Sequence, residues 1–344
     1  MFPVTFYSYK GGVGRTMALL NVASQLMADG RKVVMIDFDL EAPGLGHSTS
    51  TRRAEASGGP LPGVSDFVLD RLKGEGGAVT DYGHDVVLPG GSAFLVPSGT
   101  RASELARRVF GIVEKLGEPS ADVFRLLLSE IDLAKQPDFI LIDSRTGRAD
   151  IAGVCAMDLP RVLVAVCGLS EQNILGMADA LETIWSYHDA EELSVLTLLA
   201  VGPVPTIGRA IRPSSPLLAG VPEGSSGSGL DPLVPMAEAL IRRRIELLSA
   251  RVGARVQERF GRVQQYFPEV SADGLMHEIL YDPLVPFEDE LVEDAKRPLY
   301  GVYRRLADVL RKAAGDPIER LTGGPLPEGI GPLLSLMRKA EAPQ

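Results

Sequence analysis

The chain alternates between short, continuously apolar runs and longer segments in which apolar residues recur at helical spacing. Apolar runs of this length are typical of strands that are buried on both faces of a parallel sheet. The predicted strands cover residues 2–9, 32–37, 139–143, 161–167, 193–201 and 277–281. The helical patterns cover residues 17–27, 64–72, 102–116, 121–134, 171–187, 236–267 and 299–314. This alternation predicts an α/β fold with a mostly parallel, doubly wound sheet.

The domain organisation follows from the segments that break this alternation. Residues 85–88 and 93–97 alternate in polarity and predict a hairpin at one edge of the sheet. We expect residues 1–314 to form a single domain, with a loop-plus-helix insertion at about residues 205–270. Proline and glycine are frequent from residue 315 to residue 344, where we expect a flexible tail.

Composition excludes several classes of protein. The chain has 344 residues, of which 45% are hydrophobic and 23% are charged, as in ordinary globular proteins. A formal net charge of −10 argues against a surface that coats DNA, although a local basic patch can still bind phosphate. Two cysteines provide no disulfide framework and favour a reducing, cytoplasmic location. We expect no signal peptide and no membrane span, because the first strand begins at once and the apolar runs are short.

A glycine-rich loop, SYKGGVGRT at residues 8–16, joins the first predicted strand to the first predicted helix. Glycines allow backbone N–H groups to face a phosphate chain, and the start of a helix adds free donors and partial positive charge. In such a P-loop, Arg15 would meet the β- and γ-phosphates and the Thr16 hydroxyl would hold Mg2+. The candidate nucleotide-binding residues are Gly11, Gly12, Val13, Gly14, Arg15, Thr16 and Met17.

Carboxylates end two of the predicted strands. Asp37 and Asp39 lie in the sequence DFDLEAPG after the second apolar run, and Asp143 ends the run at residues 139–143. In open α/β sheets, ligands bind at the carboxyl ends of the strands, so we expect these acids beside the phosphates. The alternative for Asp37 and Asp39 is a solvated strand end without a ligand.

The three motifs KGGVGRT, DFDLEAPG and DSRTG resemble those of the deviant Walker A ATPases, the family of MinD, ParA, the nitrogenase iron protein and the arsenite or tail-anchor targeting ATPases. The resemblance is closest to MinD/ParA-like proteins that carry KGGVGRT, and it covers roughly residues 2–200 and, more thinly, residues 277–314. It implies a homodimer that encloses two ATP molecules. The signature lysine of the family corresponds to Lys10, which would reach the nucleotide of the partner subunit.

The resemblance also implies roles for individual residues. Asp39 would orient the attacking water, and Thr16, Asp39 and Asp143 would hold Mg2+, in the case of Asp143 through a bound water. The N–H of Gly147 would touch the γ-phosphate. The implied activity is slow ATP hydrolysis under the control of a protein partner, with Lys10, Arg15 and Asp39 as the catalytic residues.

Recognition of the base is less defined by the sequence. The loop after the strand at residues 193–201 reads GPVPTIG, where MinD-like proteins often have an asparagine. Backbone groups near Pro203 and Pro205 are the candidates for contacting adenine. The preference between ATP and GTP stays open.

Arginines leave further alternatives open. Arg145 and Arg148 lie in or beside the DSRTG motif, where they either reach phosphate or a partner subunit or remain solvated. The helix predicted over residues 236–267 carries seven arginines, from Arg242 to Arg262. We interpret it as an amphipathic helix with a solvated polar face, and the alternative is a surface for nucleic acid or another anionic partner. A membrane anchor at residues 330–339 is not expected, because glycine and proline interrupt the pattern.

Two rival functions remain at this stage. A guanidinium is not a conservative replacement for the lysine that usually ends a P-loop, so Arg15 supports a nucleotide-binding scaffold or regulator, in signalling or defence, with little hydrolysis. An iron-sulfur electron carrier would need two cysteines per subunit that face the dimer axis. Cys155 and Cys167 are instead expected in the core.

Overall fold

The structure is a computed structural model that describes residues 1–47, 61–105, 122–146, 151–204, 233–280, 291–292, 295 and 297–315. The expected tail beyond residue 315 lies outside these ranges. So do most of the helix predicted at residues 102–116 and the loop of the insertion before residue 233.

An eight-stranded sheet runs through the described part of the chain in the order β3-β4-β2-β5-β1-β6-β7-β8. β3 pairs with β4 in the antiparallel sense, and every other neighbouring pair is parallel. The predicted doubly wound sheet and its hairpin at one edge are therefore confirmed. The strands are β1 (Phe2–Tyr7), β2 (Val33–Asp37), β3 (His84–Leu88), β4 (Gly91–Val96), β5 (Phe139–Asp143), β6 (Val162–Cys167), β7 (Leu196–Val204) and β8 (Met276–Leu280).

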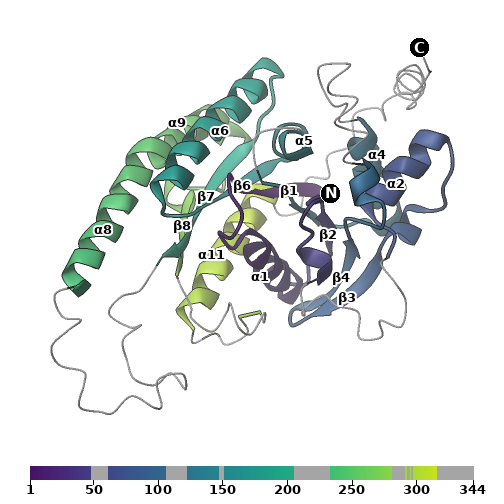
Figure 1. Ribbon diagram of the computed structural model, residues 1–344, viewed down its shortest axis with the longest axis horizontal. Helices are drawn as coiled ribbons and strands as arrows, with labels where there is room; N and C mark the ends of the chain where they lie inside the picture. The colour runs from purple at the N-terminus through teal and green to yellow at the C-terminus, as the bar shows by residue number, and fades with distance from the viewer. Residues whose placement is uncertain are drawn as a thin grey trace, which may run out of the picture.

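Helices cover both faces of the sheet (Figure 1). On one face, α1 (Arg15–Ala28) packs beside α11 (Pro298–Ala314). The other face carries α2 (Val64–Lys73), α4 (Asp122–Lys135), α5 (Ile151–Met157), α6 (Glu171–Ala190), α8 (Leu233–Leu248) and α9 (Ala254–Val263). Among the described helices, none combines the length and the apolar character that a membrane crossing requires.

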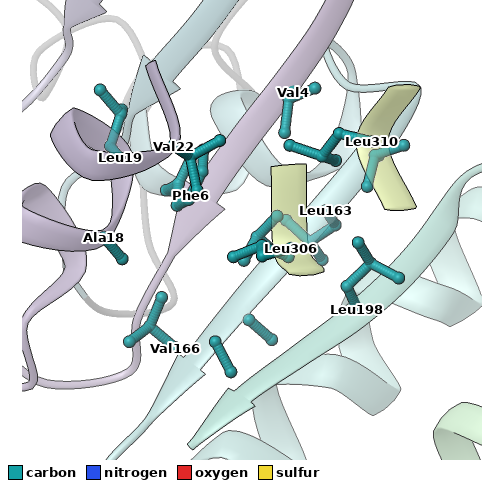
Figure 2. Packing of buried hydrophobic residues seen from close by; sticks show 14 of the residues in the cluster. Val4, Phe6, Ala18, Leu19, Val22, Leu163, Val166, Leu198, Leu306 and Leu310 are labelled. Atoms are coloured by element: carbon teal, nitrogen blue, oxygen red, sulfur yellow. The ribbon is translucent and has the colours of Figure 1, made fainter. Parts of the chain in front are cut away.

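The core explains why the strands read as continuous apolar runs. Figure 2 shows part of the main core, in which Val4, Phe6, Val166 and Leu198 of the sheet lie with Ala18, Leu19 and Val22 of α1 and with Leu306 and Leu310 of α11. A second core lies between α2, α4 and the opposite face of the sheet, and it contains Val34, Ile36, Ile140 and Ile142. Because both faces are covered, successive residues of one strand are all removed from water.

Two elements differ from the sequence-based expectation. The short helix α5 was not predicted, because seven residues are too few to establish an apolar period. The helix predicted over residues 236–267 consists of α8 and α9, joined by a π-helical turn, η4 (Ser249–Gly253). These two helices connect β7 with β8 at the edge of the sheet opposite β3. The short 3-10 turns are η1 (Leu45–His47), η2 (Val79–Tyr82), η5 (Gln264–Tyr266) and η6 (Ala272–Gly274).

Candidate nucleotide site

The sheet order brings the three sequence motifs to one place. β2, β5 and β1 are adjacent, and Asp37 of β2 stands beside Asp143 of β5 in the parallel register. The loop that follows β1 leaves the sheet at the same edge and enters α1 at Arg15. The glycine loop and both acidic strand ends therefore lie together, as the sequence predicted.

The glycine loop has the backbone conformation that its sequence suggests. Gly12 and Gly14 have φ angles of 75° and 83°, in the left-handed region that glycine tolerates best. A Cβ atom added at Gly11, Gly12 or Gly14 would meet nothing within 4 Å, so this side of the loop is open. Lys10 is half-buried at the start of the loop. A loop of this shape, followed directly by a helix, suits a chain of phosphates.

Arg15 is turned inward, toward the two acidic strand ends. Its Nε donates to Asp143 Oδ1 at 2.5 Å, and its Nη2 donates to Asp39 Oδ2 at 3.0 Å. Only 8% of the Arg15 side chain is exposed. Burial lowers the pKa of Arg15, but the charges of Asp143 and Asp39 outweigh that effect and raise it above its usual value. The guanidinium is thus a permanently charged bridge between the two motifs.

Thr16 meets the same carboxylate. Its hydroxyl donates to Asp143 Oδ2 at 2.7 Å. A Cβ atom placed on Gly44, in the DFDLEAPG motif, would lie 3.0 Å from the Thr16 hydroxyl oxygen, so that motif also packs against Thr16. Burial raises the pKa of Asp143, whereas the positive charge of Arg15 and the hydrogen bond from Thr16 act in the opposite direction. A hydroxyl with nearby carboxylates is a set of hard oxygen donors, which fits Mg2+.

Asp37 holds the backbone of the DFDLEAPG motif, a role that the sequence did not indicate. Its two carboxylate oxygens accept N–H bonds from Asp39 and Leu45, both at 3.0 Å. These bonds fold the DFDLEAPG motif back onto the strand that it leaves. Burial and the neighbouring charge of Asp143 raise the pKa of Asp37 to about 8, although the two N–H bonds lower it.

This raised pKa predicts a pH dependence of stability. Between its ordinary pKa of 3.8 and the folded value of about 8, Asp37 binds a proton in the folded state that the unfolded chain has released. The stability contributed by this proton is complete below pH 3.8 and is lost as the pH rises through about 8. We expect the free energy of unfolding to fall by up to ~1.4 kcal/mol per pH unit in this window. Urea unfolding at several pH values measures the slope.

Asp37→Asn should flatten that slope and cost about 1 kcal/mol at acidic pH, because an amide offers only one acceptor oxygen to the two N–H groups. Asp85→Asn, at an exposed position of β3, is the matched control and should leave the slope unchanged. An Asp37→Asn variant whose slope equals that of the wild type would contradict the assignment.

The remaining predicted residues divide into three groups. Val13 is buried and Met17 packs against the main core, so both of these side chains support the loop from behind. Pro203 is exposed near the end of β7. Gly147, Arg148 and Pro205 lie outside the described residues, and their predicted roles stay predictions.

Several contacts at the site had not been foreseen. The Ser8 hydroxyl lies 3.4 Å from Arg15 Nη1. Arg145 pairs with Glu41 at 2.6 Å and so connects the two acidic motifs a second time, outside the Arg15 bridge. The ring of Tyr9 packs closely over Gly176 of α6. Apart from the motifs in which these residues stand, the sequence carries no signal for such contacts, because each one depends on the distance between separate elements.

The cysteines do not form a cluster site. Cys155 is fully buried in α5, and Cys167 is buried at the end of β6. Burial raises the pKa of both thiols, that of Cys167 to about 12. Within the described ranges, no three His, Cys, Asp or Glu side chains gather in a group that could hold a metal ion unaided. Metal binding at Thr16 and Asp143 would therefore need oxygens from phosphate and water as well.

The arginine-rich helix is bound to α6 by ion pairs. Arg244 contacts Glu171 and Arg255 contacts Glu182, both at 2.6 Å, and Arg262 contacts Asp189 at 3.3 Å. Arg259, which is buried, also pairs with Asp189. These contacts support the amphipathic interpretation, since four of the seven arginines face acidic side chains of this chain. Arg242, Arg243 and Arg251 are exposed.

No protein-family model matches the chain, and no curated protein matches it either. Solved structures do match. A McdA variant from Cyanothece in complex with ATP has a TM-score of 0.60 and 14% identity, with 94% of this chain and 99% of that chain covered. MinD from Pyrococcus horikoshii with Mg-ADP has a TM-score of 0.53 and 16% identity, with 93% and 99% covered.

A third solved structure, cobyrinic acid a,c-diamide synthase from Mycobacterium smegmatis with an ATP analogue and magnesium, has a TM-score of 0.55 and 14% identity, with 90% and 93% covered. The chain thus has the fold of MinD- and McdA-like P-loop proteins, over nearly its whole length. Because a synthase shares this fold with the septum site-determining protein MinD, the fold alone does not assign the activity, which must be inferred from the residues of the site.

Proposed function

We propose that the protein is a nucleotide-dependent dimerisation switch of the MinD/ParA type, which binds Mg-ATP and hydrolyses it slowly to control a partner protein. The observation that carries this proposal is the meeting of the glycine loop, Thr16, Asp39 and Asp143 at one edge of the sheet. Solved structures with the same fold hold ATP, an ATP analogue with magnesium, and Mg-ADP.

In this proposal the loop N–H groups and Arg15 bind the phosphates, and Thr16, Asp39 and Asp143 hold the metal. Asp39 orients the attacking water, and Lys10 reaches the nucleotide of the partner subunit. Bound Mg2+ supplies positive charge where negative charge develops on the phosphates during an in-line displacement. Since one catalytic group comes from the other subunit, turnover depends on dimer formation.

The experiment is a measurement of molar mass by light scattering with Mg-ATP, Mg-ADP or no nucleotide, with phosphate release followed in parallel. We expect a dimer with Mg-ATP only, and Lys10→Ala should weaken it at least about tenfold, equivalent to ~1.4 kcal/mol, by removing a charged contact to phosphate. Lys32→Ala is the matched control, since Lys32 is exposed at the amino end of β2, the opposite edge of the sheet. A mass that is the same in all three conditions would contradict the switch.

A second candidate function is a nucleotide-binding scaffold with little hydrolysis. The observation that favours it is the engagement of Arg15 with both Asp39 and Asp143, which directs this charge away from the open side of the loop. In the same experiment, a scaffold would bind ATP and release no phosphate above the rate of the Asp143→Asn variant.

A further inference from the structure

We propose that Arg15 is the resident counter-ion of Asp39 and Asp143, so that a divalent cation gains these two carboxylates only when the guanidinium leaves them. The proposal rests on the proposed function, because it concerns how that same site is loaded. It assigns to Arg15 a second role besides contact with phosphate, namely control over metal binding.

The carboxylate oxygens of Asp39 and Asp143 are occupied by hydrogen-bond donors of this chain. Asp143 accepts Arg15 Nε on Oδ1 and the Thr16 hydroxyl on Oδ2. Asp39 accepts Arg15 Nη2 on Oδ2 and the N–H of Ala42 on Oδ1, the latter at 3.2 Å. All four oxygens therefore already have a hydrogen-bond donor. A cation, or a water bound to it, must displace one of these donors or share an oxygen with it beside a like charge.

Negative charge is concentrated at the ends of β2 and β5. Asp37, Asp39 and Asp143 are all buried at adjacent strand ends, and Arg15 is the cation that contacts two of them. Buried carboxylates without a positive partner are strongly destabilising. Either Arg15 or a metal ion must therefore neutralise Asp39 and Asp143, and the electrostatics favour one cation at a time.

The shape of the arginine side chain suits it to bridge two carboxylates. The planar guanidinium presents donors in a fixed fork, and here the Nε and Nη2 donors reach carboxylates from two different strands. A lysine ammonium at the same position is a compact charge on a flexible stem and lacks that fork. The bridge between the two strands thus depends on Arg15, the position at which this chain has arginine in place of the usual P-loop lysine.

A functional consequence follows by linkage. A triphosphate in the loop offers Arg15 an alternative anionic partner, and movement of the guanidinium to that partner would free both carboxylates for Mg2+. Nucleotide and metal would then bind cooperatively, with each increasing the affinity for the other by the same factor. In the absence of nucleotide, the wild-type site would reject divalent cations.

The test is a titration with Mn2+ alone, followed by the EPR signal of free Mn2+, together with thermal unfolding with and without Mn2+. We expect weak Mn2+ binding to the wild type, with affinity at least about tenfold higher in Arg15→Gln and intermediate in Arg15→Lys. Mn2+ should raise the unfolding temperature of Arg15→Gln but not that of the wild type. Because loss of a packing contact does not create metal-dependent stabilisation, this readout separates the proposal from a purely structural role.

Two controls locate the effect. Adding Asp143→Asn to Arg15→Gln should abolish the gain in Mn2+ affinity. Arg244→Gln, which also breaks an arginine-carboxylate pair but lies on α8, should bind Mn2+ as the wild type does. Should Arg15→Gln fail to fold, the comparison of Arg15→Lys with the wild type decides.

Equal Mn2+ affinities in the wild type and in both Arg15 variants would overturn the proposal. A further arm adds a non-hydrolysable ATP analogue to the wild type. In one outcome, the wild type takes up Mn2+ with the analogue while its Mn2+ affinity without nucleotide equals that of the Arg15 variants. That result would contradict the counter-ion role of Arg15 and support the proposed function. If the wild type binds neither Mn2+ nor the analogue, the proposed function falls, and the control of metal loading falls with it.

Discussion

Replacing Asp143 with asparagine is expected to reduce Mg2+-dependent phosphate release by roughly 10- to 100-fold, because the metal loses a charged group beside it. The same change removes a buried partner of Arg15 and should lower the free energy of unfolding by about 3 kcal/mol. Phosphate release and urea unfolding measure the two effects separately. The asparagine is nearly isosteric, so the core around β5 keeps its packing.

Asp138→Asn is the matched control for this prediction. Asp138 directly precedes β5 and accepts the N–H of Lys32 at 2.9 Å, at the amino end of the strand and far from the glycine loop. This variant should keep its phosphate release and most of its stability. Normal turnover in Asp143→Asn would show that the metal is held elsewhere.

The second large effect is expected from Gly176→Ala. A Cβ atom at this position would lie 2.0 Å from Tyr9 Cε1 and 2.4 Å from two other ring atoms, so the Tyr9 ring must move. Overpacking of this kind costs about 1–3 kcal/mol. Since Tyr9 directly precedes Lys10, its displacement should also weaken nucleotide binding, which titration with a fluorescent ATP analogue measures.

A double-mutant cycle tests whether Tyr9 is the cause. Tyr9→Ala opens the space that the new methyl group needs, so the double variant should be more stable than the sum of the two single changes predicts. Gly261→Ala in α9 is the matched control, because a Cβ atom there meets nothing within 4 Å. It should be neutral or stabilising by up to about 1 kcal/mol, as alanine is the better helix former. Purely additive effects at Tyr9 and Gly176 would rule out the contact as the cause.

Much of the fold could be predicted because its signals are local. The strand at residues 139–143 has the predicted bounds, since five apolar residues ending in an acid stand between polar turns. The order of motifs along the chain also placed the glycine loop, Asp39 and Asp143 at one edge. This inference needs only the rule that parallel strands present their carboxyl ends together.

The rest depends on contacts between distant elements. Nothing around Arg15 in the sequence says that its side chain turns toward two carboxylates rather than toward the open side of the loop. That choice depends on the register of β2 against β5, which places Asp37 beside Asp143. The closeness of Tyr9 to Gly176 likewise depends on the packing of α6 against the glycine loop. The helical period could not reveal the π-helical turn between α8 and α9.

The ion pairs between α6 and the arginine-rich helix disfavour arrangements in which one helix is shifted along the other. Arg244 with Glu171, Arg255 with Glu182 and Arg262 with Asp189 are all separated by 73 positions. A slide of one helical turn, about four residues, would bring Leu240 or Leu248 opposite Glu171 and Glu258 or Tyr266 opposite Asp189. An arginine would remain only opposite Glu182, as Arg251 or Arg259. The charges thus penalise both neighbouring positions, and the sequence specifies a single axial alignment of the two helices.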